Sequence, residues 1–176
     1  YREREDALFA EVRATLEASI PADERVPGNR YWSGSPNHQW HFATDWNHTF
    51  ELTPAEPRGG ALLLHGLTDS PYSLRAIARA LHARGYYVLA LRLPGHGTIP
   101  ASLERATWQD WLAATRLGAR TVRGKIGADR PFVMVGYSNG AALTLRHQLD
   151  ALDDPTLPRA DRILLLSPMI GVSPTA

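Results

Sequence analysis

The chain has 176 residues, of which 44% are apolar, and its 19 basic and 18 acidic residues leave a formal net charge of +1. This composition is typical of one ordinary globular domain, and it excludes a disordered chain as well as the strongly basic surface by which proteins bind nucleic acid. The sequence contains no cysteine, which excludes disulfide scaffolds, thiolate zinc sites and cysteine nucleophiles.

The first part of the chain, residues 1–57, is predicted to form a helix followed by an irregular lead-in with an edge hairpin. Apolar residues spaced four apart predict an amphipathic helix over residues 4–20. They are Leu8, Val12, Leu16 and Ile20. Residues 21–60 are rich in Pro, Gly, Asn, His and Trp, and their only strand-like piece lies at 48–52.

Residues 58–176 alternate short apolar runs with helical stretches. Strands are predicted over 61–65, 86–91, 132–137 and 162–167, and helices over 72–84, 107–122 and 139–152. Strands that are apolar on both faces and separated by helices indicate a parallel sheet that is covered on each side. With connections this short and right-handed crossovers, the predicted fold class is α/β, a doubly wound and mostly parallel sheet.

A serine is predicted at a sharp turn between a strand and a helix. Gly136-Tyr137-Ser138-Asn139-Gly140 follows an apolar run and opens a helical pattern. Such a turn needs small residues at Gly136 and Gly140, and it holds the serine in a strained backbone conformation that pushes its hydroxyl outward. We therefore interpret Ser138 as a catalytic nucleophile, with a purely structural turn as the alternative.

A second glycine motif, His65-Gly66-Leu67, stands at the carboxyl end of the first apolar strand, where open parallel sheets bind their ligands. Gly66 allows the backbone to bend toward a substrate, so the N–H groups of Leu67 and Asn139 are predicted to form an oxyanion hole. The alternative is a glycine that only turns the chain. His65 is expected to order the neighbouring loop rather than to act as a general base.

Together these residues resemble the α/β-hydrolase fold family, in its branch of serine aminopeptidase-like proteins, monoacylglycerol lipases and carboxylesterases. The resemblance covers about residues 58–170 and rests on three motifs in the order of the family: residues 62–67, Arg92-Leu93-Pro94-Gly95-His96-Gly97, and the serine turn. It implies hydrolysis of an ester, amide or thioester through an acyl-enzyme on Ser138. It also implies that His96 orders its own loop.

The resemblance further implies a chain order of Ser, then Asp or Glu, then His. After Ser138 the only histidine is His147, and the acids are Asp150, Asp153, Asp154 and Asp161. His147 falls about 13 Å along the predicted helix at 1.5 Å per residue, so it is not expected to be the base. The four acids are expected at the surface. We therefore expect a hydrolase fold truncated before its last strands, with the triad acid and histidine supplied by a remaining C-terminal portion or a second chain.

The predicted function is a serine hydrolase, lipase-like or esterase-like, that acts on a small-molecule ester or acyl substrate. A peptidase or acyltransferase that uses the same serine stays open, as does a non-catalytic α/β-hydrolase-fold module that only binds. No cofactor, no metal site and no nucleic-acid partner is expected. A soluble domain is expected and the cytoplasm is favoured, with an upstream signal or anchor left open because the sequence starts at Tyr1.

Overall fold

The computed structural model describes residues 2–38, 41–44, 46–98 and 100–171. In chain order the elements are α1 (Arg2–Ser19), the 3₁₀ turn η1 (Ala22–Glu24), β1 (Phe50–Leu52), β2 (Gly59–Leu64), η3 (Pro71–Leu74), α2 (Arg75–His82), β3 (Tyr86–Leu91), η4 (Pro100–Arg105), α3 (Trp108–Ile126), β4 (Phe132–Tyr137), α4 (Asn139–Asp153) and β5 (Arg162–Leu166). None of the helices in these ranges is long and apolar enough to span a membrane.

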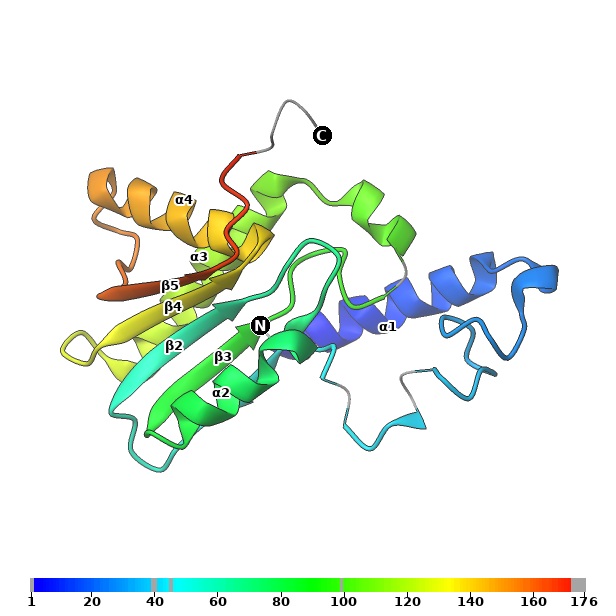
Figure 1. The fold of residues 1–176 in the computed structure, drawn as a ribbon, viewed down its shortest axis with the longest axis horizontal. Coiled ribbons are helices and arrows are strands. Elements are labelled where there is room, and N and C mark those ends of the chain that lie inside the picture. The colour runs from blue at the N-terminus through cyan, green and yellow to red at the C-terminus, as the bar shows by residue number, and fades with distance from the viewer. Residues whose placement is uncertain (1, 39–40, 45, 99, 172–176) are drawn as a thin grey trace.

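One five-stranded sheet forms the centre of the molecule, in the order β1-β3-β2-β4-β5 (Figure 1). Strands β2 to β5 pair in parallel with one another, while β1 is antiparallel to its neighbour β3. Helix α2 packs on one face of the sheet, and α3 and α4 cover the other face. The predicted doubly wound, mostly parallel α/β fold is therefore confirmed.

The core lies on both faces of the central strands. All six residues of β2 are buried, and its alternate side chains enter different apolar clusters. Leu62 and Leu64 pack in the cluster under α3 and α4, whereas Leu63 packs in the cluster under α2. Because successive side chains of a strand point to opposite faces, a strand covered on both sides has to be apolar throughout. This is why the apolar run after Gly60 occupies the middle of the sheet.

The structure differs from the predicted edge hairpin. β1 pairs with β3, with Phe50 opposite Ala90 and Leu52 opposite Val88, and does not pair with β2, which follows it in the chain. β2 is apolar along its length and takes the centre, whereas β1 is short and carries Glu51, which an edge strand tolerates. Burial of apolar surface therefore decides the strand order here, and the order along the chain does not.

The opposite edge of the sheet is more open. Among the described residues β5 pairs with β4 alone. Its residues Ile163 and Leu164 are 38% and 47% exposed. Since β2, β4 and β5 are parallel, their carboxyl ends lie together at one end of the sheet. The loops that follow these three ends build the candidate site.

Candidate active site

The site begins at the turn between β4 and α4, where Ser138 is the N-cap of the helix. Its backbone has φ 51° and ψ −113°. A positive φ of this kind costs a non-glycine residue roughly 1–3 kcal/mol, so it persists only where the surrounding structure enforces it. The residue is half-buried. Its hydroxyl forms no hydrogen bond with the described part of the chain.

Two glycines enforce this turn. A Cβ at Gly136 would lie 2.5 Å from both the backbone nitrogen and the Cα of Ala141. A Cβ at Gly140 would lie 2.6 Å from the carbonyl oxygen of His65, and closer still to that of Leu64. Real Cβ atoms essentially never approach within 3.0 Å. A side chain at either position would therefore force α4 away from β4 or β2.

The same close packing brings the predicted oxyanion motif, His65-Gly66-Leu67, to the serine. Gly140 rests on the end of β2, and Gly66 follows that end. A Cβ at Gly66 would lie 3.1 Å from two ring atoms of Tyr137 and 3.5 Å from the Cβ of Ser138. The fold thus places side by side two glycine motifs that are far apart in the sequence.

The N–H groups of Leu67 and Asn139 have no acceptor among the described residues. Neither amide donates a backbone or side-chain hydrogen bond there. Asn139 is the first residue of α4, and the first N–H groups of a helix have no partner inside it. The Leu67 side chain is exposed, and that of Asn139 is buried. Two unpaired donors beside a serine are what stabilisation of a negatively charged oxygen requires.

His65 is a neutral ring whose two nitrogens are both engaged. Its Nε2 accepts a hydrogen bond from the Leu93 N–H at 3.1 Å, so this nitrogen carries no proton. The proton is therefore on Nδ1, which donates to the carbonyl oxygen of Gly66 at 2.9 Å. Burial, reinforced by the neighbouring His96 and Arg92, lowers the pKa of His65 to about 3. His65 orders the loop, as predicted, and has no nitrogen left to act as a base.

His96 holds the other side of Leu67. Its Nε2 lies 2.7 Å from the carbonyl oxygen of Leu67, and a carbonyl can only accept, so the ring donates there. The other ring nitrogen, Nδ1, lies 3.0 Å from the carbonyl oxygen of Pro94, and burial lowers the pKa of His96. The ring packs edge-on between His65 and Trp111, at centroid distances of 4.7 and 5.4 Å. The expectation that His96 orders its loop agrees with these contacts.

Together the two histidines fix both peptide groups that flank Leu67. The described peptide bonds are all trans, and in a trans peptide the carbonyl points opposite the following N–H. The bond from His65 to the Gly66 carbonyl therefore sets the direction of the Leu67 N–H. The bond from His96 fixes the next peptide in the same way. The Leu67 N–H is held from both sides without any ligand.

The other predicted candidates are engaged elsewhere. His147 is fully buried inside α4, and its Nε2 donates to the carbonyl oxygen of Pro158 at 2.9 Å. Among the acids after the serine, Asp150 pairs with two arginines, and Asp154 and Asp161 accept backbone N–H groups. Asp153 is exposed to solvent. No described histidine forms a hydrogen bond with the Ser138 hydroxyl. In the same ranges, no three His, Asp or Glu side chains gather closely enough to hold a metal ion.

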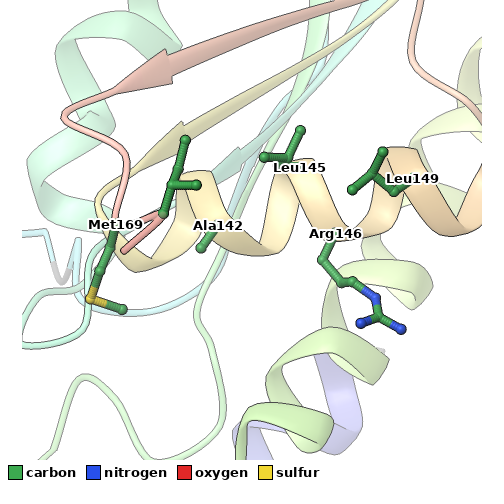
Figure 2. Close-up of a pocket in the computed structure, with 6 residues that line it drawn as sticks. Ala142, Leu145, Arg146, Leu149 and Met169 are labelled. Atoms are coloured by element: carbon green, nitrogen blue, oxygen red, sulfur yellow. The ribbon is translucent and has the colours of Figure 1, made fainter. Parts of the chain in front are cut away.

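An open, mostly apolar groove of about 190 Å³ runs along α4 (Figure 2). Its lining residues are Ala142, Leu145, Arg146, Leu149, Met169 and Ile170. Figure 2 shows the helical residues along one side of α4, with Met169 beside its first turns. The Met169 N–H donates to the carbonyl oxygen of Ser138 at 3.2 Å, so the groove starts next to the serine. Its surface suits an apolar group better than a charged one.

Sequence reasoning missed a buried charged cluster beside this site. Arg92 is almost completely buried, and its Nε lies 3.2 Å from Oε1 of Glu5 in α1. Arg92 begins the motif that contains His96, so the sequence could indicate where Arg92 lies. The motif gives no indication that Glu5 is its partner. Glu5 lies in a helix whose pattern gave no reason to expect a buried acid.

Known proteins match the second part of the chain. The family model described as "Alpha/beta hydrolase family" matches residues 61–176. The thermostable monoacylglycerol lipase of Bacillus sp. (strain H-257) is 38% identical over 86 residues, which make up 49% of this chain and 33% of that protein. The chain thus matches about a third of the length of this curated relative.

Two solved structures share the arrangement of elements. The structure described for LipS and LipT, two metagenome-derived lipolytic enzymes, has a TM-score of 0.59 and 27% identity, and covers 74% of this chain and 54% of its own. The monoacylglycerol lipase of Paleococcus ferrophilus has a TM-score of 0.57 and 20% identity, and covers 73% of this chain and 46% of its own. At the lower identity the likeness is one of fold alone.

Proposed function

The chain belongs to the alpha/beta hydrolase family, and on that premise we propose that it is a serine hydrolase which cleaves carboxylic esters through an acyl-enzyme on Ser138. The observation that carries the proposal is the backbone of Ser138, with φ 51° between a strand and a helix. A strained serine enforced by two glycines that tolerate no side chain is costly for a turn that only connects two elements.

The proposed reaction has two halves. The Ser138 oxygen attacks the carbonyl carbon of the ester while a general base takes its proton. The carbonyl oxygen becomes negative and accepts hydrogen bonds from the N–H groups of Leu67 and Asn139. When the tetrahedral intermediate collapses, the alcohol leaves with the proton from the base. Water then attacks the acyl-enzyme in the same way, which releases the acid and restores Ser138.

The base and the acid of this proposal come from outside the described residues. His65, His96 and His147 each bond backbone groups, and none of them bonds Ser138. We therefore infer that a histidine and an acidic residue from a further portion of the same protein, or from a second chain, complete the site. Without a base the serine is a weak nucleophile, and loss of the base alone removes nearly all the activity of a triad enzyme.

The proposed substrate is an ester with an apolar acyl group. The loop after β5 and the oxyanion loop both present exposed apolar side chains near Ser138, namely those of Leu67, Met169 and Ile170. The names of the Bacillus and metagenomic relatives describe lipolytic enzymes, and one names a monoacylglycerol. These two observations favour ester cleavage over the peptidase and acyltransferase hypotheses. The unpaired oxyanion donors argue against a module that only binds, because binding alone does not require them.

A fluorophosphonate probe tests the proposal on the complete natural protein. We expect the wild type to be labelled and Ser138→Ala to lose the label, together with hydrolysis of p-nitrophenyl esters. Ser167→Ala is the matched control, since Ser167 also has a positive φ, of 44°, at the end of a neighbouring strand and is exposed. It should keep the label. A folded wild type that takes no label would leave only the binding module, and faster cleavage of aminoacyl amides than of esters would favour a peptidase.

A further inference from the structure

We propose that Glu5, in helix α1, is a positioning residue for the oxyanion hole and acts through the buried guanidinium of Arg92. The proposal rests on the function proposed above. Glu5 lies outside residues 61–176, the part of the chain that matches the family. The inference therefore concerns how this chain's own N-terminal segment supports the site.

The pair is buried on both sides. The side chains of Arg92 and Glu5 are 0% and 4% exposed, and Nε lies 3.2 Å from Oε1. The same Oε1 accepts a hydrogen bond from the hydroxyl of Thr49 at 2.7 Å, and that hydroxyl accepts the N–H of Arg92 at 2.9 Å. A buried charge pair persists only where geometry and added hydrogen bonds offset its desolvation. Glu5 thus holds both the side chain and the backbone of Arg92.

A second residue of α1 also packs against the guanidinium. Phe9, one helical turn after Glu5, is buried, and its ring centroid lies 3.0 Å from the Cζ of Arg92. A cation above an aromatic face is attracted to it, most strongly when both are shielded from water. Two buried residues of α1, Glu5 and Phe9, thus contact the same guanidinium.

Arg92 is the first residue of the loop that reaches the oxyanion hole. Gly97, at the end of that loop, has φ 72°, and a Cβ there would lie 2.7 Å from the Cδ of Arg92. Between the two, the Leu93 N–H bonds His65 and the ring of His96 bonds the Leu67 carbonyl oxygen. The loop that Arg92 begins thus supplies the His96 contact itself, and through the Leu93 N–H it holds the His65 ring that makes the other contact.

The lead-in touches the oxyanion loop directly as well. Oδ1 of Asn47 accepts a hydrogen bond from the Ser70 hydroxyl at 2.6 Å. The carbonyl oxygen of Asn47 packs against Gly97, where a Cβ would lie 2.8 Å away. The N-terminal segment therefore contacts both the loop after β2 and the loop after β3, which together orient the Leu67 N–H. Glu5 is the buried acidic residue of this segment that pairs with Arg92.

Glu5→Gln removes this charge while keeping the size of the side chain. It removes the negative charge that Nε of the buried Arg92 faces, so we expect the loop that begins there to shift and the Leu67 N–H to move with it. Because the oxyanion exists only in the transition state, such a shift lowers kcat and leaves KM nearly unchanged. Displacement of a catalytic group by about 1 Å can cost 10²-fold in rate. We expect a fall in kcat of about 10- to 100-fold, with KM within about twofold.

The experiment measures ester hydrolysis by the complete natural protein, for wild type, Glu5→Gln and Leu157→Ala. Leu157 is buried before β5, at the end of the sheet away from the site, so its truncation is a matched loss of stability. It should lower the unfolding midpoint and leave kcat per folded molecule unchanged. An unchanged kcat in folded Glu5→Gln would overturn the proposal. Loss of activity in Ser138→Ala must hold in the same assay, since activity that survives there defeats the proposed function instead.

A milder variant covers the case in which Glu5→Gln does not fold. Thr49→Val removes only the hydroxyl that joins Glu5 to the Arg92 N–H. We expect kcat to fall by a smaller factor than in Glu5→Gln, again with KM nearly unchanged. The ¹⁵N–¹H signal of the His96 Nε2 proton gives a readout without catalysis, because it reports the bond to Leu67. It should shift in both variants and stay in place in Leu157→Ala, and an unmoved signal in Thr49→Val would overturn the proposal.

Discussion

Acid is expected to destabilise the fold through His65, and the effect can be isolated with His65→Gln. Folding lowers the pKa of this ring from 6.5 to about 3, because burial disfavours its charged form. Below pH 6.5 the unfolded chain therefore binds a proton that the folded chain does not. Stability is present above pH 6.5 and is lost as the pH falls from there toward 3, by about 1.4 kcal/mol per pH unit.

The magnitude follows from these two pKa values. Between pH 7.5 and 4.5, His65 alone should remove about 3 kcal/mol from the free energy of unfolding. The glutamine side chain of the variant does not titrate, and its amide oxygen can still accept the Leu93 N–H that the ring accepts now. The variant should be less stable at pH 7.5, yet should lose about 3 kcal/mol less than the wild type on acidification.

Urea unfolding at several pH values measures this difference, with the fluorescence of the five tryptophans as the signal. Agreement between fluorescence and circular dichroism midpoints checks that unfolding is two-state. If wild type and His65→Gln lose equal stability between pH 7.5 and 4.5, the assignment of His65 as a buried neutral ring is refuted. His147 also has a pKa lowered by burial, and its contribution cancels because both proteins retain it. The same comparison in a His96→Gln background removes the titration of His96, whose ring contacts His65.

Three further tests, one of them with a control variant, address separate parts of the structure. Gly140→Ala should abolish fluorophosphonate labelling and lower the melting temperature, because the new methyl group meets the Leu64 and His65 carbonyl oxygens; Gly124→Ala, where a Cβ meets nothing within 4 Å, should do neither. Thr107→Ala removes the capping box of α3 and should cost about 1 kcal/mol in urea unfolding without altering the hydrolysis rate. His147→Gln should keep the label on Ser138, since the ring bonds Pro158, and a folded variant that loses the label would contradict this placement.

Much of the hydrolase region could be predicted from sequence because its signals are local. A buried parallel strand needs an unbroken apolar run, and Ala61 to Leu64 provides one in consecutive residues. The serine turn is equally local, because the space for Gly136 and Gly140 is limited by atoms of the adjoining strand ends and helix start. The prediction that small residues are needed there therefore agrees with the geometry.

Some features depend on contacts between residues that are distant in the chain. β1 pairs with β3 rather than with the next strand, because the more apolar β2 takes the central place. The proton of His65 is assigned to Nδ1 only by the Leu93 N–H that its other nitrogen accepts. Neither fact has a signal within a few residues of the group concerned.

The sequence by itself determined which segments along the chain are strands and helices and where the strained serine lies. Periodicity and glycine placement, on which these predictions rest, are properties of neighbouring residues. The tertiary structure alone decided that Glu5 meets Arg92 and that two buried histidines hold the peptides on either side of Leu67. The physical reason is desolvation. A charge or an imidazole takes its state from the groups that exclude water around it, and those groups come together only when the chain has folded.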